Sequence, residues 1–420
     1  MRGIPTRSPR KMGRCDMRIF DREYSAEKHY LAGTHRSRSP AQTVAAMRRH
    51  MPRMGITRLA NVTGLDHVGI PVFVSVRPNS LSLATAQGKG VDVDSARASA
   101  LMESVEGWHA EHIELPLRWD SYQRLRRQAP VVDVDRLALV NPVNHALARG
   151  WLEGWDLIGG CSTWVPYDVV TTDYVAGTRS EFLQTSNGLA SGNHLLEAAV
   201  HGLCELIERD AEALWHANAD LRAVDLTCIE EPYCAALLTR LRRAELFVAA
   251  WEMTSDLGIP AFGCLVMNTP EQNRWRVEGL HYGYGCHLEP AVALSRAISE
   301  AVQTRLTYIA GSRDDLRKSD YLGTRNPDHL REAYDELRAM APNRRLSDMA
   351  SLATRTFEGD LEVLLDAVRR AGLPQAILVD LGKPELEMAV VRMVVPDLMT
   401  CDAVLPMNRL PASRAAMGGV

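Results

Sequence analysis

The segment SNGLASGNHLLEAAVHGLCELIERD, residues 186–210, joins a glycine-rich approach to a long run of helical periodicity. Across residues 192–217 the aliphatic side chains recur on one side at 3.6-residue spacing, which predicts a long amphipathic helix. At about 100° per residue, Glu208 falls near 20° and Glu205 near 80° from Glu197. Three carboxylates therefore share one face of this helix.

Two other segments are predicted to form long helices that carry acids at helical spacing. One begins near Asp94 or Ser95, either of which could cap it, and the other spans about residues 290–309. Polar stripes follow one face of each helix: Ser99, Glu103 and Glu106 in the first, and Arg296, Glu300 and Gln303 in the second. Acids gathered from three segments repel one another unless a cation neutralises them, and Mg²⁺ prefers oxygen ligands. The three helices together favour a magnesium-nucleotide site.

Each helix taken alone also fits other interpretations. A stripe of acids opposite an apolar stripe is typical of a solvated surface helix, and Arg296 with Glu300 fits an i,i+4 ion pair. A di-iron centre is a further alternative, because acids and histidines are spaced by three at Glu103, Glu106, His109 and His112. That centre needs a second Glu-x-x-His, which the sequence lacks, so the two histidines are assigned to the surface or a helix cap.

Composition indicates a globular protein with a substantial core. The chain has 420 residues, of which 46% are hydrophobic. A formal net charge of -4, a pI near 6.4 and 6% aromatic residues give no basis for nucleic-acid binding. No apolar run approaches the roughly 20 residues that cross a bilayer, so we expect no membrane association.

The eight cysteines are scattered without a C-x-x-C pair, which argues against a zinc cage and against a secreted disulfide framework. A reducing cytoplasm fits best. The basic start is not followed by a signal-peptide core. We therefore expect a disordered basic tail over residues 1–25, or an over-long start with Met12 or Met17 as the true beginning. The main domain is expected over 26–400 and a C-terminal tail over 401–420.

The order of predicted elements indicates the α+β class, without regular βαβ alternation. A short helix is expected after Pro40. Strands are expected at 57–62, 72–77, 246–251, 261–267, 376–380 and 388–395. The glycines of Gln87-Gly-Lys-Gly90 predict a loop, but they lack the spacing of a P-loop, and no dinucleotide fingerprint is present.

A short internal repeat suggests that two halves of the chain are structurally related. Gly69-Ile-Pro begins a strand that leads through Gly88 to the first acidic helix, and Gly258-Ile-Pro begins one that leads through Gly285 to the third. Superposition matches Ser99 with Arg296, Glu103 with Glu300 and Glu106 with Gln303. These positions would then face each other across a shared cleft, although a three-residue match is also compatible with chance.

At these helices the sequence resembles the YcaO family, ATP-dependent enzymes that modify peptide backbone amides. The resemblance runs from about Gly33 to Pro396 and follows the family's order of motifs. These motifs are Ser99-x-x-x-Glu103-x-x-Glu106, Asn193-x-x-x-Glu197, Glu205-x-x-Glu208-Arg209 and Arg296-x-x-x-Glu300. Residues 33–40 and 55–66, with 69–73, look especially like the stand-alone YcaO proteins that are paired with TfuA partners. The implied fold is YcaO-type, with mixed sheets and long helices around a central nucleotide-binding cleft.

The resemblance implies roles for individual residues with ATP and Mg²⁺ as cofactors. The magnesium ligands would be Glu103, Glu106, Glu205, Glu208 and Glu300. The nucleotide contacts would be Ser99, Asn193, Glu197, Arg209 and Arg296, with the two arginines also stabilising charge during catalysis. On the adenine side, Arg36 and Thr43 are the nearest equivalents of the family's Lys and Ser. Ala86 replaces the Ser usual before the Gln-Gly-Lys-Gly segment, a change not expected to disable catalysis.

The implied reaction is phosphorylation of an amide oxygen in the biosynthesis of a ribosomally made, modified peptide. Thioamide formation is preferred because of the TfuA-type resemblance, and because residues 409–420 lack the Pro-x-Pro-x-Pro ending of many azoline formers. Azoline cyclodehydration and a non-catalytic scaffold are the alternatives. The N-terminal stretch is too short for a leader-binding winged helix, so a TfuA-like or ThiF-like partner is expected to deliver the peptide or protein substrate. A homodimer is also compatible with the resemblance.

Overall fold

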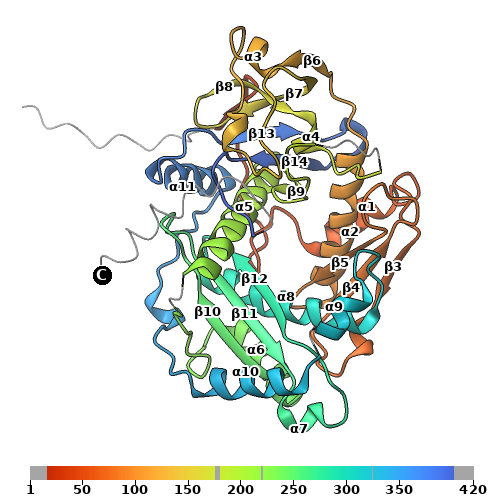
Figure 1. The fold of residues 1–420 in the computed structure, drawn as a ribbon, viewed down its shortest axis with the longest axis vertical. Helices are drawn as coiled ribbons and strands as arrows, with labels where there is room; N and C mark the ends of the chain where they lie inside the picture. Colours follow the sequence, from red (N-terminus) through yellow and green to blue (C-terminus); the bar gives the residue numbers. More distant parts are fainter. Residues whose placement is uncertain (1–16, 176–179, 219–220, 324, 402–420) are drawn as a thin grey trace, which may run out of the picture.

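The computed structural model describes residues 17–175, 180–218, 221–323 and 325–401 (Figure 1). The long helices are α2 (Val93–Glu111), α5 (Leu195–Ala217) and α8 (Pro290–Ala310). The shorter ones are α1 (Pro40–Arg48), α3 (Tyr122–Leu125), α4 (Tyr167–Val170), α6 (Pro232–Arg243), α7 (Pro270–Asn273), α9 (Lys318–Gly323), α10 (Pro327–Ala339) and α11 (Phe357–Arg370). The α+β class is confirmed.

Antiparallel sheets alternate with these helices. One sheet has the order β3 (Arg58–Asn61), β4 (Val72–Val76), β5 (Thr85–Lys89), and another has β10 (Phe247–Glu252), β11 (Ala261–Met267), β12 (His281–Cys286). The largest runs β6 (Arg118–Ser121), β7 (Ala148–Asp156), β13 (Ile377–Asp380), β14 (Ala389–Val394), β9 (Leu189–Gly192), with β8 (Cys161–Pro166) beside β7. The sheet in the upper part of Figure 1 thus combines strands from the middle and the end of the chain.

The internal repeat is present in the fold. Each half has a three-stranded antiparallel sheet followed by a long helix: β3-β4-β5 with α2, and β10-β11-β12 with α8. Gly88 and Gly285 lie against equivalent helix positions. A Cβ on Gly88 would lie 1.9 Å from Ala100 N and 2.5 Å from Ala96 O, and one on Gly285 would lie 2.1 Å from Ala293 O and 2.7 Å from Ala297 N. Glycine is required at both positions because only it lets the strand approach the helix this closely.

Helix α5 packs between the large sheet, through β9 and β14, and the β10-β11-β12 sheet of the second half (Figure 1). Its apolar stripe packs with α11, β9 and β14 in one hydrophobic core, where Leu196, Leu203 and Ile207 are fully buried. A second core lies between α6, α8 and the β10-β11-β12 sheet. These cores fix the angular position of α5 and α8, and therefore the direction of the polar stripes opposite.

Two local expectations near the start of α2 differ from the structure. The segment Gln87–Gly90 is not a loop, because β5 continues to Lys89 and pairs with β4. Asp92, rather than Asp94 or Ser95, caps α2, and its carboxylate accepts a hydrogen bond from Ser95 N at 2.7 Å.

The expected tail over 1–25 is wrong for residues 17–25. Met17–Ile19 (β1) pairs with Arg22–Tyr24 (β2), and Ile19 is fully buried in the core around α5. Residues 1–16 and 402–420 lie outside the described residues, so the remaining domain boundaries stay predictions.

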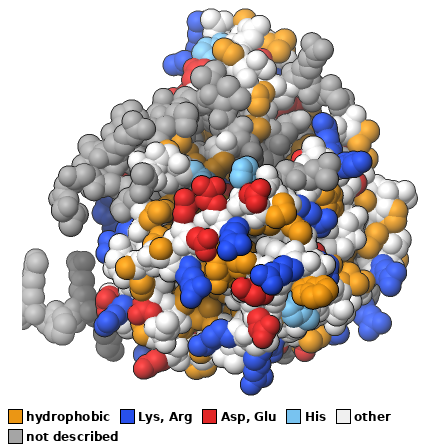
Figure 2. Space-filling view, turned by 60° about the horizontal axis from the view of Figure 1, so that its bottom comes forward, with side chains coloured by type: hydrophobic (Ala, Val, Ile, Leu, Met, Phe, Trp, Pro, Cys, Tyr) orange, Lys and Arg blue, Asp and Glu red, His pale blue; other side chains and the backbone are white. Residues whose placement is uncertain are grey.

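Among the described residues, no helix combines the length and apolarity that crossing a membrane requires. On the face shown in Figure 2, basic and acidic side chains are interspersed. This mixture is consistent with the near-neutral composition and differs from the basic stripe typical of a nucleic-acid surface.

Candidate functional site

A cleft of about 580 Å³ is lined by side chains from α2, α5 and α8. The cleft brings together every residue that the sequence assigned to the magnesium or nucleotide site: Ser99, Glu103, Glu106, Asn193, Glu197, Glu205, Glu208, Arg209, Arg296 and Glu300. Arg36, Thr43 and Gln303 also line it. The predicted convergence of the three helices is therefore present, while the ligand role of each residue stays a prediction.

Glu197 is held at one end of the cleft by the segment that precedes α1. Its Oε2 accepts hydrogen bonds from the N–H of Ser37, at 3.1 Å, and from the Ser37 hydroxyl. Its Oε1 lies 3.5 Å from Arg36 Nη1 and accepts from Asn193 Nδ2 at 3.4 Å. Thr43 Oγ1 in turn donates to Asn193 Oδ1 at 3.0 Å. The N-terminal segment and α5 are thus joined through polar groups that the sequence had placed on the nucleotide.

Glu106 and Glu205 are oriented by backbone amides of the glycine-rich approach to α5. Glu106 Oε1 accepts from Ser191 N at 2.8 Å and from Ser191 Oγ at 2.6 Å. Glu205 Oε2 accepts from Gly188 N at 3.3 Å. Gly188 has φ of +79°, and a Cβ there would lie 2.5 Å from Met393 O. The glycine therefore allows the backbone turn that brings this amide to Glu205.

Arg209 connects acids from two helices. Its Nη2 lies 3.0 Å from Glu208 Oε1 and 3.7 Å from Glu300 Oε1, and its Nη1 lies 2.8 Å from Glu212 Oε2. Nearby carboxylates raise the pKa of Arg209 against the opposing effect of burial. The guanidinium is therefore a fixed positive charge at the junction of α5 and α8.

Glu103 and Glu300 occupy equivalent positions in the two halves. Glu103 accepts a backbone hydrogen bond from Gln87 on β5. Glu300 accepts one from Tyr284 N on β12 at 3.3 Å. Gln87 directly precedes Gly88 and Tyr284 directly precedes Gly285, so the pairing follows the same superposition as the glycines. The sequence repeat therefore correctly placed these two acids on one cleft.

Most of these carboxylates have raised pKa values. Burial raises the pKa of Glu103 and of Glu205 to about 7. Burial, together with the charges of Glu103 and Glu205, raises the pKa of Glu106 to about 8. Burial also raises the pKa of Glu208. The Glu103 side chain is exposed, but the solvent that reaches it lies inside the cleft, where protein atoms surround the carboxylate. A bound cation would favour the ionised form of all four.

Glu300 differs because cations of the protein surround it. Burial disfavours its ionised form, but the charges of Lys89 and Arg209 outweigh burial and lower the pKa of Glu300. The Lys89 ammonium group forms an ion pair with Glu300 Oε2. In the sequence, Lys89 stands out only as part of the Gln87–Gly90 segment, which lacks the spacing of a P-loop. The two glycines beside it were the available signal, since they allow β5 to lie against α2.

The Arg296 guanidinium faces the cleft, and little in the protein neutralises its positive charge. Its Nη1 donates to the carbonyl of Cys286 at 3.3 Å, and within the described residues no carboxylate lies within ion-pair distance of it. Burial and the charge of Arg36 lower the pKa of Arg296. The alternative of an Arg296–Glu300 ion pair is therefore wrong. The geometry leaves this guanidinium available to an anion in the cleft.

The other sequence alternatives also fail. Glu197 and Glu208 are only 2% and 7% exposed, so α5 is not a solvated surface helix on that face. His109 is buried and lies outside the cleft, and its Nδ1 donates to the carbonyl oxygen of Val105 at 2.7 Å. Burial lowers the pKa of His109 to about 4. His112 is the C-cap of α2, as one expectation had it, and stacks on Trp108. The di-iron arrangement is therefore not formed.

The donor set fits the groups that the sequence implied. Five carboxylates supply hard oxygen ligands of the kind that Mg²⁺ prefers. Lys89, Arg209, Arg296 and Arg313 line the same cleft and provide positive charge for phosphates. A bound metal ion would neutralise the acids of the cleft. The phosphates of a bound nucleotide would neutralise its basic side chains.

Comparison with known proteins agrees with this geometry. A family described as YcaO cyclodehydratase, ATP- and Mg²⁺-binding, matches residues 87–399. The chain belongs to the YcaO family. Its cofactors are ATP and Mg²⁺, as expected from the resemblance.

Similar sequences include two uncharacterized proteins. One, encoded in the tfuA 3′ region of Rhizobium leguminosarum bv. trifolii, is 35% identical over 377 residues, covering 86% of this chain and 88% of that protein. One from Methanothermobacter thermautotrophicus is 31% identical over 374 residues, covering 86% and 94%. The match to each of these two proteins therefore extends over most of both chains.

Solved structures show the same YcaO fold. YcaO from Methanopyrus kandleri, bound with AMPPCP and Mg²⁺, superposes with a TM-score of 0.70 at 24% identity, covering 89% of this chain and 94% of that one. A heterocyclase in complex with substrate and cofactor gives a TM-score of 0.78 at 21% identity, covering 96% of this chain. This chain spans 57% of that heterocyclase's length.

Proposed function

We propose that this protein uses ATP and Mg²⁺ to phosphorylate a backbone amide oxygen of a peptide or protein substrate, and that the product is a thioamide. The observation that carries the proposal is the convergence of five glutamates from α2, α5 and α8 on one cleft that also holds Arg209 and Arg296. Membership of an ATP- and Mg²⁺-binding family supports the nucleotide part. The tfuA-region relative supports the thioamide part.

In this proposal five of the cleft glutamates are magnesium ligands. Glu103, Glu106, Glu205, Glu208 and Glu300 hold the magnesium ions. Glu106 and Glu205 are already oriented by the amides of Ser191 and Gly188, so binding would need little rearrangement of these two. Ordered carboxylates of this kind favour a defined metal position over diffuse attraction.

The nucleotide contacts come from the remaining cleft residues. Ser99, Asn193, Glu197, Arg209 and Arg296 would hold the nucleotide, with Arg36 and Thr43 fixing the Glu197 and Asn193 side chains. Bound magnesium-ATP supplies an electrophilic phosphoryl group and neutralises its charge. Arg209 and Arg296 donate hydrogen bonds where negative charge develops, which is the main electrostatic demand of phosphoryl transfer.

The chemical logic follows from the weakness of an amide as an electrophile. Addition of sulfide to the carbonyl carbon produces an oxyanion, and the C–O bond breaks only after that oxygen carries phosphate. Phosphate then leaves with the original oxygen, and sulfur takes its place. The protein supplies positioning and charge, and no nucleophile of its own is needed.

Azoline formation is a second candidate, supported by the family's description as cyclodehydratases. A Cys, Ser or Thr side chain of the substrate would then attack in place of sulfide. A non-catalytic scaffold is a third candidate, and the presence of all five metal-site acids in one cleft argues against it.

A mass measurement separates the candidates. The protein is incubated with ATP, Mg²⁺ and a precursor peptide encoded beside its gene, with and without sulfide and a TfuA-like or ThiF-like partner. Thioamide formation adds about 16 Da only with sulfide, whereas cyclodehydration removes about 18 Da without it, phosphate activation being common to both. Peptide-dependent release of ADP or AMP accompanies either product. A chain that releases neither nucleotide with any of these peptides and partners would instead be a scaffold.

A further inference from the structure

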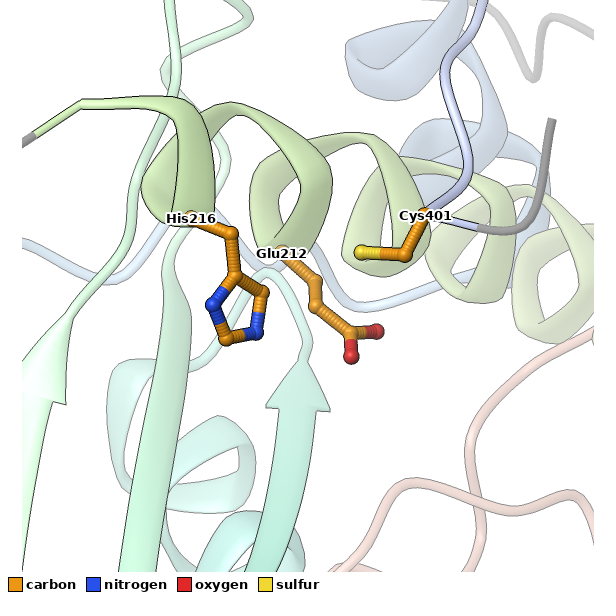
Figure 3. Close-up of side chains that lie close together, drawn as sticks. All are labelled: Glu212, His216 and Cys401. Carbon is orange, nitrogen blue, oxygen red and sulfur yellow. The ribbon is translucent and has the colours of Figure 1, made fainter. Parts of the chain in front are cut away.

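Beside the cleft, three side chains with different metal-binding groups lie together at the C-terminal end of α5. A carboxylate oxygen of Glu212, an imidazole nitrogen of His216 and the Cys401 sulfur all lie within 4.8 Å of one another (Figure 3). We propose that Glu212, His216 and Cys401 bind a zinc ion, separate from the magnesium-nucleotide site. The zinc site does not depend on the proposed reaction.

The two helical ligands are placed by their spacing. Glu212 and His216 are four residues apart, so they project from successive turns of α5 on the same side, as Figure 3 shows. Glu212 Oε2 accepts from Arg209 Nη1 at 2.8 Å. A carboxylate has a second oxygen, which remains able to coordinate an ion.

The third ligand is brought to α5 by contacts of the residues before it. Met399 N donates to Asp210 Oδ1 at 2.9 Å, and the Met399 side chain is buried against Ala213 and Leu214. Thr400 Oγ1 accepts from Asn187 Nδ2 at 3.3 Å. The backbone is therefore fixed immediately before Cys401. The thiol is not part of a disulfide and is exposed, so an ion from solvent can reach it.

The surroundings also resemble those of a metal ligand. His216 Nε2 lies 3.3 Å from the Tyr284 hydroxyl, and metal-bound histidines commonly use one ring nitrogen for such an orienting hydrogen bond. The same tyrosine hydrogen-bonds to Glu212. Tyr284 thus contacts both helical ligands and, through its backbone N–H, Glu300 in the cleft.

The ligand types select the ion. A thiolate, an imidazole and a carboxylate suit Zn²⁺, which binds four ligands tetrahedrally, whereas Mg²⁺ prefers oxygen alone. Tetrahedral bonds of normal zinc length would bring the three ligand atoms to about 3.5 Å from one another, an approach of about 1 Å from the present limit. Three protein ligands leave the fourth position for water or a small anion.

The test uses the full-length chain, stripped with a chelator and titrated with Co²⁺ or Zn²⁺ in excess Mg²⁺. One Co²⁺ per chain is expected, with tetrahedral d–d bands and a thiolate-to-cobalt charge-transfer band. Cys401→Ser and His216→Asn should each remove these bands and weaken binding at least roughly tenfold. Cys228→Ser removes another exposed thiol, far along the chain from Cys401, and should keep both bands.

Equal metal affinity in the wild type and in Cys401→Ser, or a cobalt spectrum without the thiolate band, would overturn the zinc site. The affinity for a magnesium-bound, non-hydrolysable ATP analogue is measured on the same samples. It should change less than about threefold in Cys401→Ser, because the thiol lies outside the cleft lining. A wild-type chain that shows the cobalt bands but binds no nucleotide would contradict the proposed function and leave the zinc site supported.

Discussion

The Lys89 ammonium group on β5 forms an ion pair with the Glu300 carboxylate on α8, so a strand of the first half neutralises an acid of the second. Both side chains are only partly exposed, at 23% and 18%. Lys89 thus neutralises part of the charge on Glu300 that a bound Mg²⁺ would also neutralise. The following substitutions test this arrangement and the fold that supports it.

Lys89→Met should make the metal-free protein less stable by about 1–3 kcal/mol, because Glu300 loses a charged hydrogen-bond partner in a cleft that already holds five other acids. Mg²⁺ should therefore raise the melting temperature more in this variant than in the wild type. Thermal unfolding with and without Mg²⁺ measures both effects. Arg369→Met, which removes an exposed cation from α11, is the matched control. An equal magnesium-induced shift in both variants would mean that Lys89 does not substitute for the metal.

Arg296→Met should weaken binding of an ATP analogue by about tenfold or more, since a charged hydrogen bond contributes about 1.5–3 kcal/mol. Its effect on the nucleotide-free protein should be opposite in sign. Removing a buried cation that Arg36 repels should leave the free energy of unfolding unchanged or increase it. Titration calorimetry and denaturant unfolding measure the two effects. A destabilised variant with normal nucleotide affinity would assign Arg296 a structural role instead.

Gly88→Ala and Gly285→Ala should each destabilise the fold by about 3 kcal/mol or more, because the new methyl group would overlap helix backbone atoms that cannot move away cheaply. Gly64→Ala is the control, since a Cβ there meets nothing within 4 Å. Denaturant unfolding compares the three. If Gly88→Ala were as stable as Gly64→Ala, the close approach of β5 to α2 would be incorrect.

Glu111→Gln should cost about 3–5 kcal/mol at pH 7, because it leaves the buried Arg77 guanidinium without its ion-pair partner at the end of α2. Burial opposes ionisation of Glu111, but hydrogen bonds from Ser80 and Ser82 and the Arg77 charge outweigh it and lower the pKa of Glu111. This stabilisation is present above the unfolded-state pKa of about 4.3 and is lost as pH falls through the lower folded-state pKa.

The stability difference between the wild type and Glu111→Gln should therefore shrink as the pH falls below about 4. Urea unfolding from pH 7 to pH 3 measures it, with Glu362→Gln on the exposed face of α11 as the control. A difference that stays constant over this range would mean that the Glu111 charge does not stabilise the fold.

Helix phase was largely predictable from the sequence. The apolar stripes of α5 and α8 face packed cores, so the acids opposite point as periodicity predicts. Whether those acids face bulk water or a cleft was not predictable from one helix, because both environments produce the same stripe. The repeat supplied this information, since it paired Glu103 with Glu300 through equivalent strand-helix units.

Other features depend on contacts between distant segments. Lys89 looked like a loop residue because glycines usually weaken strands. Here, however, Gly88 and Gly90 on either side of it let this segment lie against α2. Ile19 lies in a basic stretch, and only its packing against the α5 core reveals that residues 17–24 form a hairpin. Cys401 gave no motif because its neighbours His216 and Glu212 are almost 200 residues earlier in the chain.

The most direct test of the account is the magnesium dependence of nucleotide binding in the wild type and in Glu205→Gln, with Glu362→Gln as the control. The wild type should bind a non-hydrolysable ATP analogue more tightly as Mg²⁺ increases, and Glu205→Gln should lose at least about tenfold of that gain while remaining folded. If the analogue binds equally well without Mg²⁺ and the substitution has no effect, the acids of this cleft do not hold the metal-nucleotide pair.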